Sequence, residues 1–182
     1  TLTDNNTVTS NTGILSSAGQ FTAANSEYLS SADNAAVSMG DIDFTIAAWV
    51  YADSLAGGGA ANAIVGKWGA TPTAQDYLIY FDGSAAQFTV CLNNASGTVN
   101  CAAAGSSLTT STWYYVVAWY DAAADLIWIQ VNNGTAVSAA HTGGARDTAQ
   151  DFELGRYNST GYWNGRIDEV GVWKRTLSST ER

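Results

Sequence analysis

Positive charge is scarce in this chain of 182 residues, and so are proline and histidine. Seven Lys and Arg residues stand against sixteen Asp and Glu residues, which gives a net charge of −9. Proteins that bind nucleic acid present a basic surface to the phosphates, and anionic membrane surfaces attract the same kind of charge. The composition therefore predicts no nucleic-acid partner and argues against an anionic membrane surface.

Long apolar runs are missing too. No stretch approaches the ~18 consecutive apolar residues of a membrane-spanning helix, so we expect no membrane insertion. A single histidine and two cysteines offer no cluster for zinc. The chain begins at Thr1 without the pattern of a signal peptide, and we expect a processed chain or a fragment of a larger protein.

Short β-rich runs separated by Gly, Asn, Asp and Ser turns dominate the sequence, and no useful segment has a helical period. We predict a single domain over residues 1–182, an all-β, two-sheet antiparallel jelly-roll sandwich. Residues 1–12 form a polar arm or edge strand, and a capping box at Ser178 and Glu181 predicts a helix start that is truncated at 178–182. The predicted strands are 14–22, 27–31, 43–52, 62–68, 76–82, 86–92, 98–103, 113–121, 125–132, 135–140, 151–157 and 162–174.

Two predicted strands, 43–52 and 113–121, are apolar or aromatic on both faces. This pattern predicts central strands covered on both sides. We expect four tryptophans, in these strands and the next, to pack in the core or on a sheet face: Trp49, Trp113, Trp119 and Trp128.

The two cysteines flank a hairpin turn. If the turn centres on Ser96, Cys91 and Cys101 lie opposite each other, and opposed strand residues meet disulfide geometry. The alternative is two reduced, buried thiols. A disulfide would indicate an extracellular or virion setting.

Residues 165–181, GRIDEVGVWKRTLSSTE, carry a family resemblance. They resemble the closing strand of laminin-G-like domains in the concanavalin A-like lectin/glucanase superfamily, and segments 27–30, 43–50 and 112–117 fit the same pattern in order. The resemblance implies a jelly-roll sandwich, non-catalytic recognition or adhesion through glycans or proteins, and, in many relatives, a bound calcium ion.

The residue pattern gives candidate positions for such a cation. Alternation places Asp168 on the same strand face as Val170 and Val172. A carboxylate among inward-facing valines must be paired, hydrogen-bonded or bound to a metal. We therefore predict that Asp168 is largely buried and is satisfied by backbone N–H groups, by Arg166 or by calcium. Asp41 and Asp43 are further candidates for calcium.

Catalytic residues are not evident. Glycosidases need two carboxylates that flank the scissile bond, and here only Asp41 and Asp43 alternate on one strand, at its start. We predict His141 to be exposed in a polar loop. The sequence therefore predicts no enzyme activity.

Residues 157–164 combine aromatic rings with amides and hydroxyls, a mixture suited to stacking on sugars and hydrogen-bonding them. Trp68, which we expect in a Gly-flanked turn, is a second such position. The alternative is that these side chains pack against their neighbours. The predicted ligand-binding residues are Tyr157, Asn158, Tyr162, Trp163, Asn164 and Trp68.

Three functions fit these observations. The first is a recognition or adhesion module that binds a glycan or a surface protein. The second is a structural subunit of an extracellular assembly, such as a virion decoration, tail or fibre protein, with self-assembly or virion partners. The third is a glycoside hydrolase. We expect an extracellular, cell-surface or virion-surface location.

Overall fold

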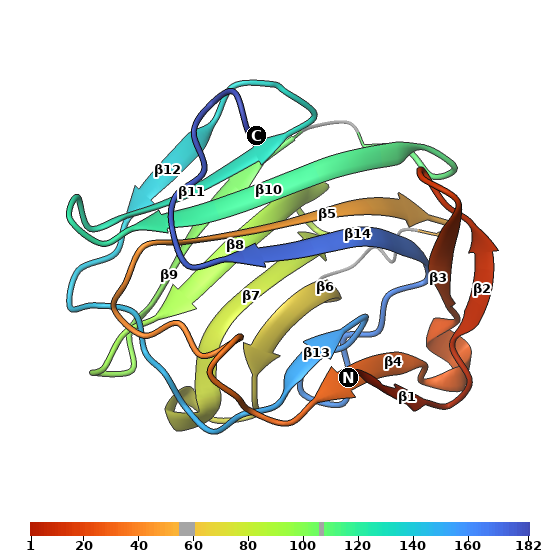
Figure 1. Cartoon of the computed structure of the whole chain (residues 1–182), viewed down its shortest axis with the longest axis horizontal. Coiled ribbons are helices and arrows are strands. Elements are labelled where there is room, and N and C mark those ends of the chain that lie inside the picture. The colour runs from red at the N-terminus through yellow and green to blue at the C-terminus, as the bar shows by residue number, and fades with distance from the viewer. Residues whose placement is uncertain (55–60, 106–107) are drawn as a thin grey trace.

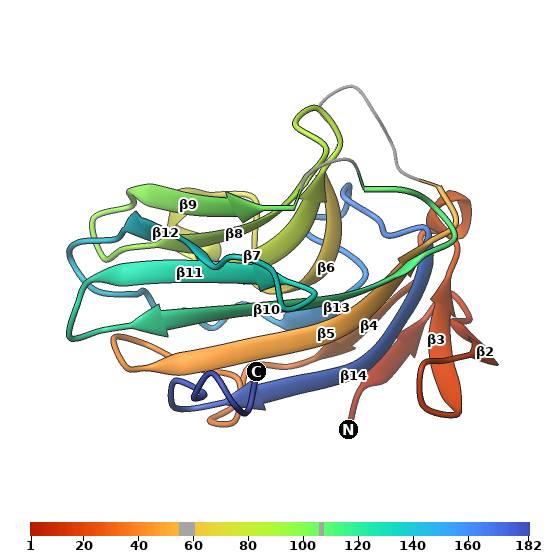
Figure 2. The ribbon, with the colours of Figure 1, turned by 90° about the horizontal axis from the view of Figure 1, so that it is seen from above.

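The computed structural model describes residues 1–54, 61–105 and 108–182, and within them two antiparallel seven-stranded sheets lie face to face (Figures 1 and 2). Sheet A contains, in spatial order, β1 (Thr3–Asn5), β4 (Tyr28–Ser31), β13 (Phe152–Leu154), β6 (Ala61–Trp68), β7 (Gln75–Asp82), β8 (Gln87–Asn93) and β9 (Val99–Ala104). Sheet B contains β12 (Val137–Ala140), β11 (Leu126–Val131), β10 (Trp113–Asp121), β5 (Phe44–Ala52), β14 (Gly165–Trp173), β3 (Ser17–Phe21) and β2 (Thr9–Thr12).

The all-β prediction is confirmed. Each predicted strand overlaps an observed one, and the polar segment 1–12 holds β1 and the edge strand β2. The helices among the described residues are two short 3-10 turns, η1 (Ala23–Asn25) and η2 (Pro72–Ala74), and neither is long and apolar enough to cross a membrane. The predicted capping box forms a turn, in which the Glu181 carboxylate accepts hydrogen bonds from the Ser178 backbone N–H and hydroxyl, both at 2.9 Å.

The core lies between the sheets because alternate residues of each strand point inward. In β5 these are Phe44, Ile46, Ala48 and Val50, all nearly inaccessible to solvent. The Phe44 ring lies 5.8 Å from that of Tyr77 in sheet A, which joins the two layers. β5 and β10 are central strands of sheet B, as predicted.

The outer face of sheet B differs from the prediction. Ala47 and Val117 are buried there, but four aromatic side chains farther along the same two strands are only half-buried. The described residues form no third sheet that would cover them. The prediction that both faces are covered is therefore wrong for these positions: Trp49, Tyr51, Trp113 and Tyr115.

A β-bulge in β14 changes which residues point outward. Ile167 pairs with the inward Val50, and Val172 pairs with the inward Ile46, because the register shifts between Asp168 and Gly171. Glu169 within the bulge has a φ of 49°, in the left-handed region. Asp168 therefore lies on the outer face, and the prediction that it shares a face with Val170 and Val172 is wrong.

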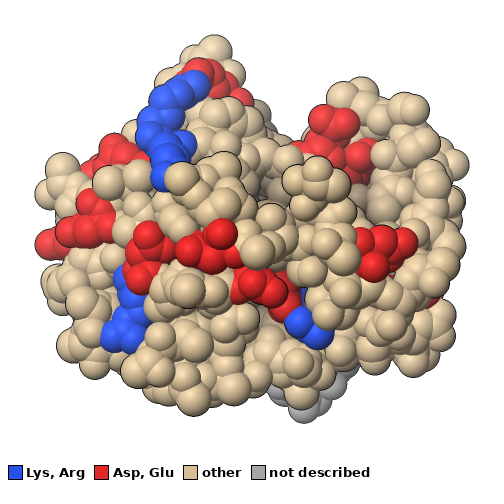
Figure 3. Space-filling model, turned by 60° about the horizontal axis from the view of Figure 1, so that its bottom comes forward, with Lys and Arg blue, Asp and Glu red and all other residues tan. Residues whose placement is uncertain are grey.

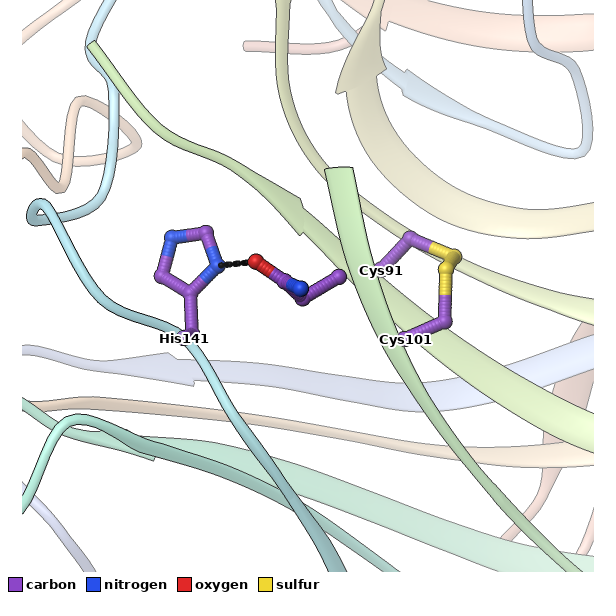
Figure 4. Close-up of a disulfide and its surroundings, with 4 residues drawn as sticks. Cys91, Cys101 and His141 are labelled. Carbon is purple, nitrogen blue, oxygen red and sulfur yellow. Dashed lines mark hydrogen bonds between the residues drawn. A yellow bond between two sulfur atoms is a disulfide. The ribbon is translucent and has the colours of Figure 1, made fainter. Parts of the chain in front are cut away.

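Sheet A ends in a cross-linked hairpin. Cys91 of β8 pairs with Cys101 of β9 in the predicted register, and the two form a disulfide with a Cα–Cα distance of 4.2 Å. Figure 4 shows this bond and His141 on opposite sides of the hairpin. Of the two alternatives for Cys91 and Cys101, the structure has the disulfide across the hairpin and not two reduced thiols.

His141 is buried rather than exposed, which corrects the sequence prediction. Its Nδ1 lies 3.2 Å from Asn100 Oδ1 in sheet A, and its ring meets Tyr120 of sheet B edge-on at 5.6 Å. The histidine thus links the two sheets at one end of the sandwich. Burial lowers the pKa of the imidazole.

Candidate functional site: an aromatic groove on sheet B

Four half-buried side chains on two neighbouring strands form what we call the aromatic face: Trp49 and Tyr51 of β5, and Trp113 and Tyr115 of β10. Antiparallel pairing places Trp49 opposite Tyr115, with ring centroids 5.3 Å apart, and Tyr51 opposite Trp113, at 5.4 Å. Because outward positions alternate with core positions, the packing of the sandwich fixes where these rings stand.

A groove of about 570 Å³ lies over this face. Its walls come from the turn after β11 and from the segment after β14, which crosses in front of β5, β10 and β11 (Figures 1 and 2). The described residues that line it are Trp49, Trp113, Tyr115, Asn132, Asn133, Ser179, Thr180 and Arg182.

The C-terminal wall is held by contacts with the sheet beneath it. The Thr45 hydroxyl donates to the Arg175 carbonyl at 2.9 Å and accepts from the Leu177 N–H at 3.1 Å. The Arg182 guanidinium lies 3.9 Å from the ring centroid of Trp119, a cation–π contact. The wall is therefore attached at both of its ends.

The turn wall is equally constrained. Asn132 Oδ1 accepts the Tyr115 N–H at 2.8 Å, and the Asn132 N–H donates to the Tyr115 carbonyl at 2.8 Å. Asn132 and Asn133 both have φ in the left-handed region, at 53° and 61°. Asn tolerates this conformation better than most residues, which explains the Asn-Asn-Gly sequence of the turn.

The groove combines ring faces with hydrogen-bonding groups. Asn133, Ser179 and Thr180 are exposed at its rim, and burial raises the pKa of Tyr115, whose phenol therefore stays neutral. Among the described lining residues, Arg182 carries the charge. The face of the molecule that Figure 3 shows carries a band of Asp and Glu side chains, with few Lys and Arg side chains among them. The groove thus suits a polar ligand with apolar faces.

The residues predicted from segment 157–164 differ in their exposure. Trp163 is 1% exposed and belongs to the main core. Asn164 is used structurally: its Oδ1 accepts the Ala23 N–H at 3.2 Å, and its amide donates to Ser54 Oγ at 2.9 Å. Tyr157, Asn158 and Tyr162 are half-buried.

Trp68 ends β6 rather than standing in a turn, and it is buried. With Ala63, Leu78 and Cys91 it forms a small cluster, against which Tyr157 packs. Because the rings of Trp68 and Trp163 are buried, neither ring is accessible to a sugar. The prediction that these two residues stack on a ligand is therefore wrong.

Asp168 is largely buried, as predicted, and it accepts three backbone hydrogen bonds. Its Oδ2 accepts the N–H groups of Ile14 at 2.8 Å and Leu15 at 3.4 Å, and its Oδ1 accepts that of Glu169 at 2.9 Å. Arg166 does not pair with it: this side chain donates to the Thr12 carbonyl and lies over the Tyr51 ring.

These three N–H groups satisfy the Asp168 carboxylate in the described structure, which matches the backbone option of the sequence prediction. Asp41 and Asp43 lie elsewhere, where Asp41 accepts from the Tyr120 hydroxyl and Asp43 from the Ala122 N–H. Among the described residues, no group of three or more His, Cys, Asp or Glu side chains is arranged to hold a metal. The calcium role remains a prediction.

A cluster of charged side chains surrounds Lys67, whose own side chain is fully buried. Its Nζ lies 2.7 Å from Asp33, 3.1 Å from Asp76 and 3.2 Å from Asp147, and it donates to the Thr148 carbonyl at 2.8 Å. Burial opposes the charge, but the carboxylates together raise the pKa of Lys67 above its usual value. The hydrogen bond from Lys67 lowers the pKa of Asp33. The carboxylates of this cluster are thus directed at its own buried cation.

The chain belongs to the concanavalin A-like lectin/glucanases superfamily, whose family model matches residues 21–181. A comparison with curated proteins found no match to the sequence.

Several solved structures share the fold. The binding domain of Paraclostridial Mosquitocidal Protein 1 is similar with a TM-score of 0.77 and 14% identity, over 100% of this chain and 45% of that one. Domain 4 of AbnA, a GH43 extracellular arabinanase from Geobacillus stearothermophilus, was solved with arabinotriose. It has a TM-score of 0.72 and 14% identity, over 100% of this chain and 84% of that one.

The CBM40 of the Ruminococcus gnavus IT-sialidase, bound to α2,3-sialyllactose, is also similar. Its TM-score is 0.62 and its identity 17%, over 77% of this chain and 80% of that one. This chain spans less than half of the mosquitocidal binding domain. At these identities the likeness shows a common fold.

Proposed function

We propose that the chain is a non-catalytic, extracellular glycan-binding module and that the sugar lies in the groove over the aromatic face. The observation that carries the proposal is the open groove, in which half-buried Trp49, Trp113 and Tyr115 stand among exposed amide and hydroxyl groups. Rings of this kind stack on the C–H faces of sugars, while the rim groups bond to hydroxyls.

Two similar structures were solved with sugars, arabinotriose in one and sialyllactose in the other, which supports a glycan as the ligand class. The Cys91–Cys101 disulfide supports an extracellular location. A hydrolase needs two carboxylates roughly 5–9.5 Å apart across the sugar. The described residues that line the groove include no Asp or Glu, which supports binding without turnover.

The proposal is tested by affinity electrophoresis through gels that contain arabinan, xylan or mixed-linkage β-glucan. We expect at least one of these polysaccharides to retard the parent, and we expect Trp49→Ala and Trp113→Ala to weaken that retardation about tenfold, since tenfold corresponds to ~1.4 kcal/mol. Tyr157→Ala is the matched control, because it removes a half-buried ring from the segment predicted by sequence. Circular dichroism confirms folding of each variant, and no reducing sugar should be released.

Loss of binding in Tyr157→Ala but not in the tryptophan variants would move the site to segment 157–164. If no polysaccharide retards the parent, the glycan proposal fails, and the structural-subunit alternative, with protein contacts, becomes the better account.

A further inference from the structure

The turn between β2 and β3 presents two aliphatic side chains to solvent. Leu15 is 66% exposed and Ile14 is 37% exposed, within an otherwise polar stretch. We call this pair the aliphatic tip. Single exposed aliphatic residues are ordinary on protein surfaces, so the tip becomes informative only through how it is held and where it lies.

A buried carboxylate holds the tip in place. Asp168 Oδ2 accepts the backbone N–H groups of Ile14 and Leu15, at 2.8 and 3.4 Å, while its Oδ1 accepts the N–H of Glu169 in the β14 bulge. A Cβ at Gly13 would stand 2.3 Å from Asp168 Oδ2, so the glycine permits this approach. A turn fixed in this way loses little conformational entropy when its side chains meet a partner.

The tip and the groove lie on the same face of sheet B. Asp168 pairs with Trp49 across β14 and β5, and Trp49 pairs with Tyr115 across β5 and β10. All three side chains point outward, away from the core residues that alternate with them. Two strand spacings, about 10 Å, therefore separate Tyr115 in the groove from Asp168 beneath the tip.

We propose that the ligand is an oligosaccharide whose chain runs across the strands, from the groove over Trp49 to the aliphatic tip, and that Asp168 is the residue that positions the tip. This inference rests on the proposed function and specifies its substrate class. A single sugar ring is shorter than the separation of groove and tip, so both are used only by a longer chain. Ile14 and Leu15 offer no side-chain hydrogen bond, and the sugar presents its C–H face to them.

The test is titration calorimetry with arabino-, xylo- and cello-oligosaccharides, each from the disaccharide to the hexasaccharide. The parent should gain affinity with chain length. The double variant Ile14→Ser/Leu15→Ser should bind disaccharides as the parent does but lose about tenfold for the hexasaccharide, as expected for two partly buried aliphatic contacts.

Val99→Ser is the matched control, since Val99 is an aliphatic residue of similar exposure to Ile14, at 39%, on the edge strand β9 of sheet A. It should leave the length dependence unchanged. Asp168→Asn should weaken binding of the hexasaccharide while sparing the disaccharide, whereas a merely structural defect would weaken both alike.

Equal affinities of the parent and the Ile14→Ser/Leu15→Ser variant for every chain length would overturn this inference and leave the groove as the whole site. Equal loss for short and long chains in Asp168→Asn would overturn its positioning role. If the parent binds none of the three series, the proposed function and this extension of it both fail.

Discussion

The Lys67 cluster and the aromatic face differ in how far their main side chains are exposed to solvent. Around Lys67, three carboxylates and a carbonyl enclose a fully buried ammonium. On the aromatic face, Trp49, Trp113 and Tyr115 are half-buried, beside exposed Asn, Ser and Thr side chains. In the first region the cation is fully buried by its partners, whereas in the second the rings themselves remain half-exposed.

The difference separates stability from binding. A buried ion cluster is worth little when complete and costs much when broken, so its effect is on folding. Half-exposed rings add little to the core and keep surface free for a ligand. Variants of the Lys67 cluster should therefore change the free energy of unfolding. Variants of the aromatic face should instead change the affinity for the ligand.

The largest effect is expected at Lys67. Lys67→Met leaves the buried Asp76 and its neighbours without their cation, which should lower the free energy of unfolding by about 3–5 kcal/mol. Denaturant titration measures this, and retardation by polysaccharide should be unchanged where the variant is folded. Asp147→Asn, at a side chain 43% exposed, should cost less than about 1 kcal/mol. A small loss for Lys67→Met would remove the contrast between the two regions.

The disulfide should rank second. Replacing both Cys91 and Cys101 by Ser opens a loop closed over a sequence separation of 10, at a cost of about 3 kcal/mol in the chain-entropy model. The melting temperature of the double variant should lie between those of the parent without reductant and of the parent with reductant. A parent that melts identically in reductant, with reduction verified by thiol titration, would contradict this expectation.

Asp168 should have an intermediate effect. Asp168→Ala leaves the N–H groups of Ile14 and Glu169 without their acceptor, which should cost about 1–3 kcal/mol. Melts of the parent in calcium and in chelator test the metal prediction at the same time. Equal melting temperatures of the parent in calcium and in chelator would end the calcium hypothesis. An Asp168→Ala variant as stable as the parent would show that these hydrogen bonds do not stabilise the fold.

The smallest effect should come from pH. Burial lowers the pKa of folded His141 below the usual 6.5, so the unfolded chain takes up its proton first as the pH falls. Stability should therefore decline from about pH 6.5 downward and be unaffected above it. His141→Phe keeps a ring against Tyr120 without a titrating group, and unfolding curves at about pH 7.5 and 5.5 should show a smaller decline than in the parent. An equal decline would assign the acid sensitivity to carboxylates.

The strands were predictable because their signals are local. Alternation and turn residues located each of the twelve predicted strands to within a few residues, and the symmetric spacing about Ser96 placed Cys91 opposite Cys101. Asp168 shows where this reasoning stops. Its burial was predicted correctly. A bulge in β14, however, places Asp168 on the opposite face from Val172, and strict alternation along the sequence does not reveal where a strand contains an extra residue.

The groove was missed for a related reason. Trp49, Trp113 and Tyr115 alternate with core residues, and a strand that is apolar on both faces looks the same whether its second face is covered or open. Conversely, Trp163 and Trp68 stand among turn-forming residues, yet tertiary packing buries them. The signal that could have located the groove is the pairing of outward aromatics on two neighbouring strands, which requires the register.

The cross-linked hairpin has a mechanical consequence. β9 is the edge strand of sheet A, so along its length it has hydrogen bonds to one neighbour, β8. An edge strand under tension unzips one bond pair at a time, and each break exposes the next. The Cys91–Cys101 bond sits within this ladder and is covalent, so peeling that begins at either end of β9 must stop there.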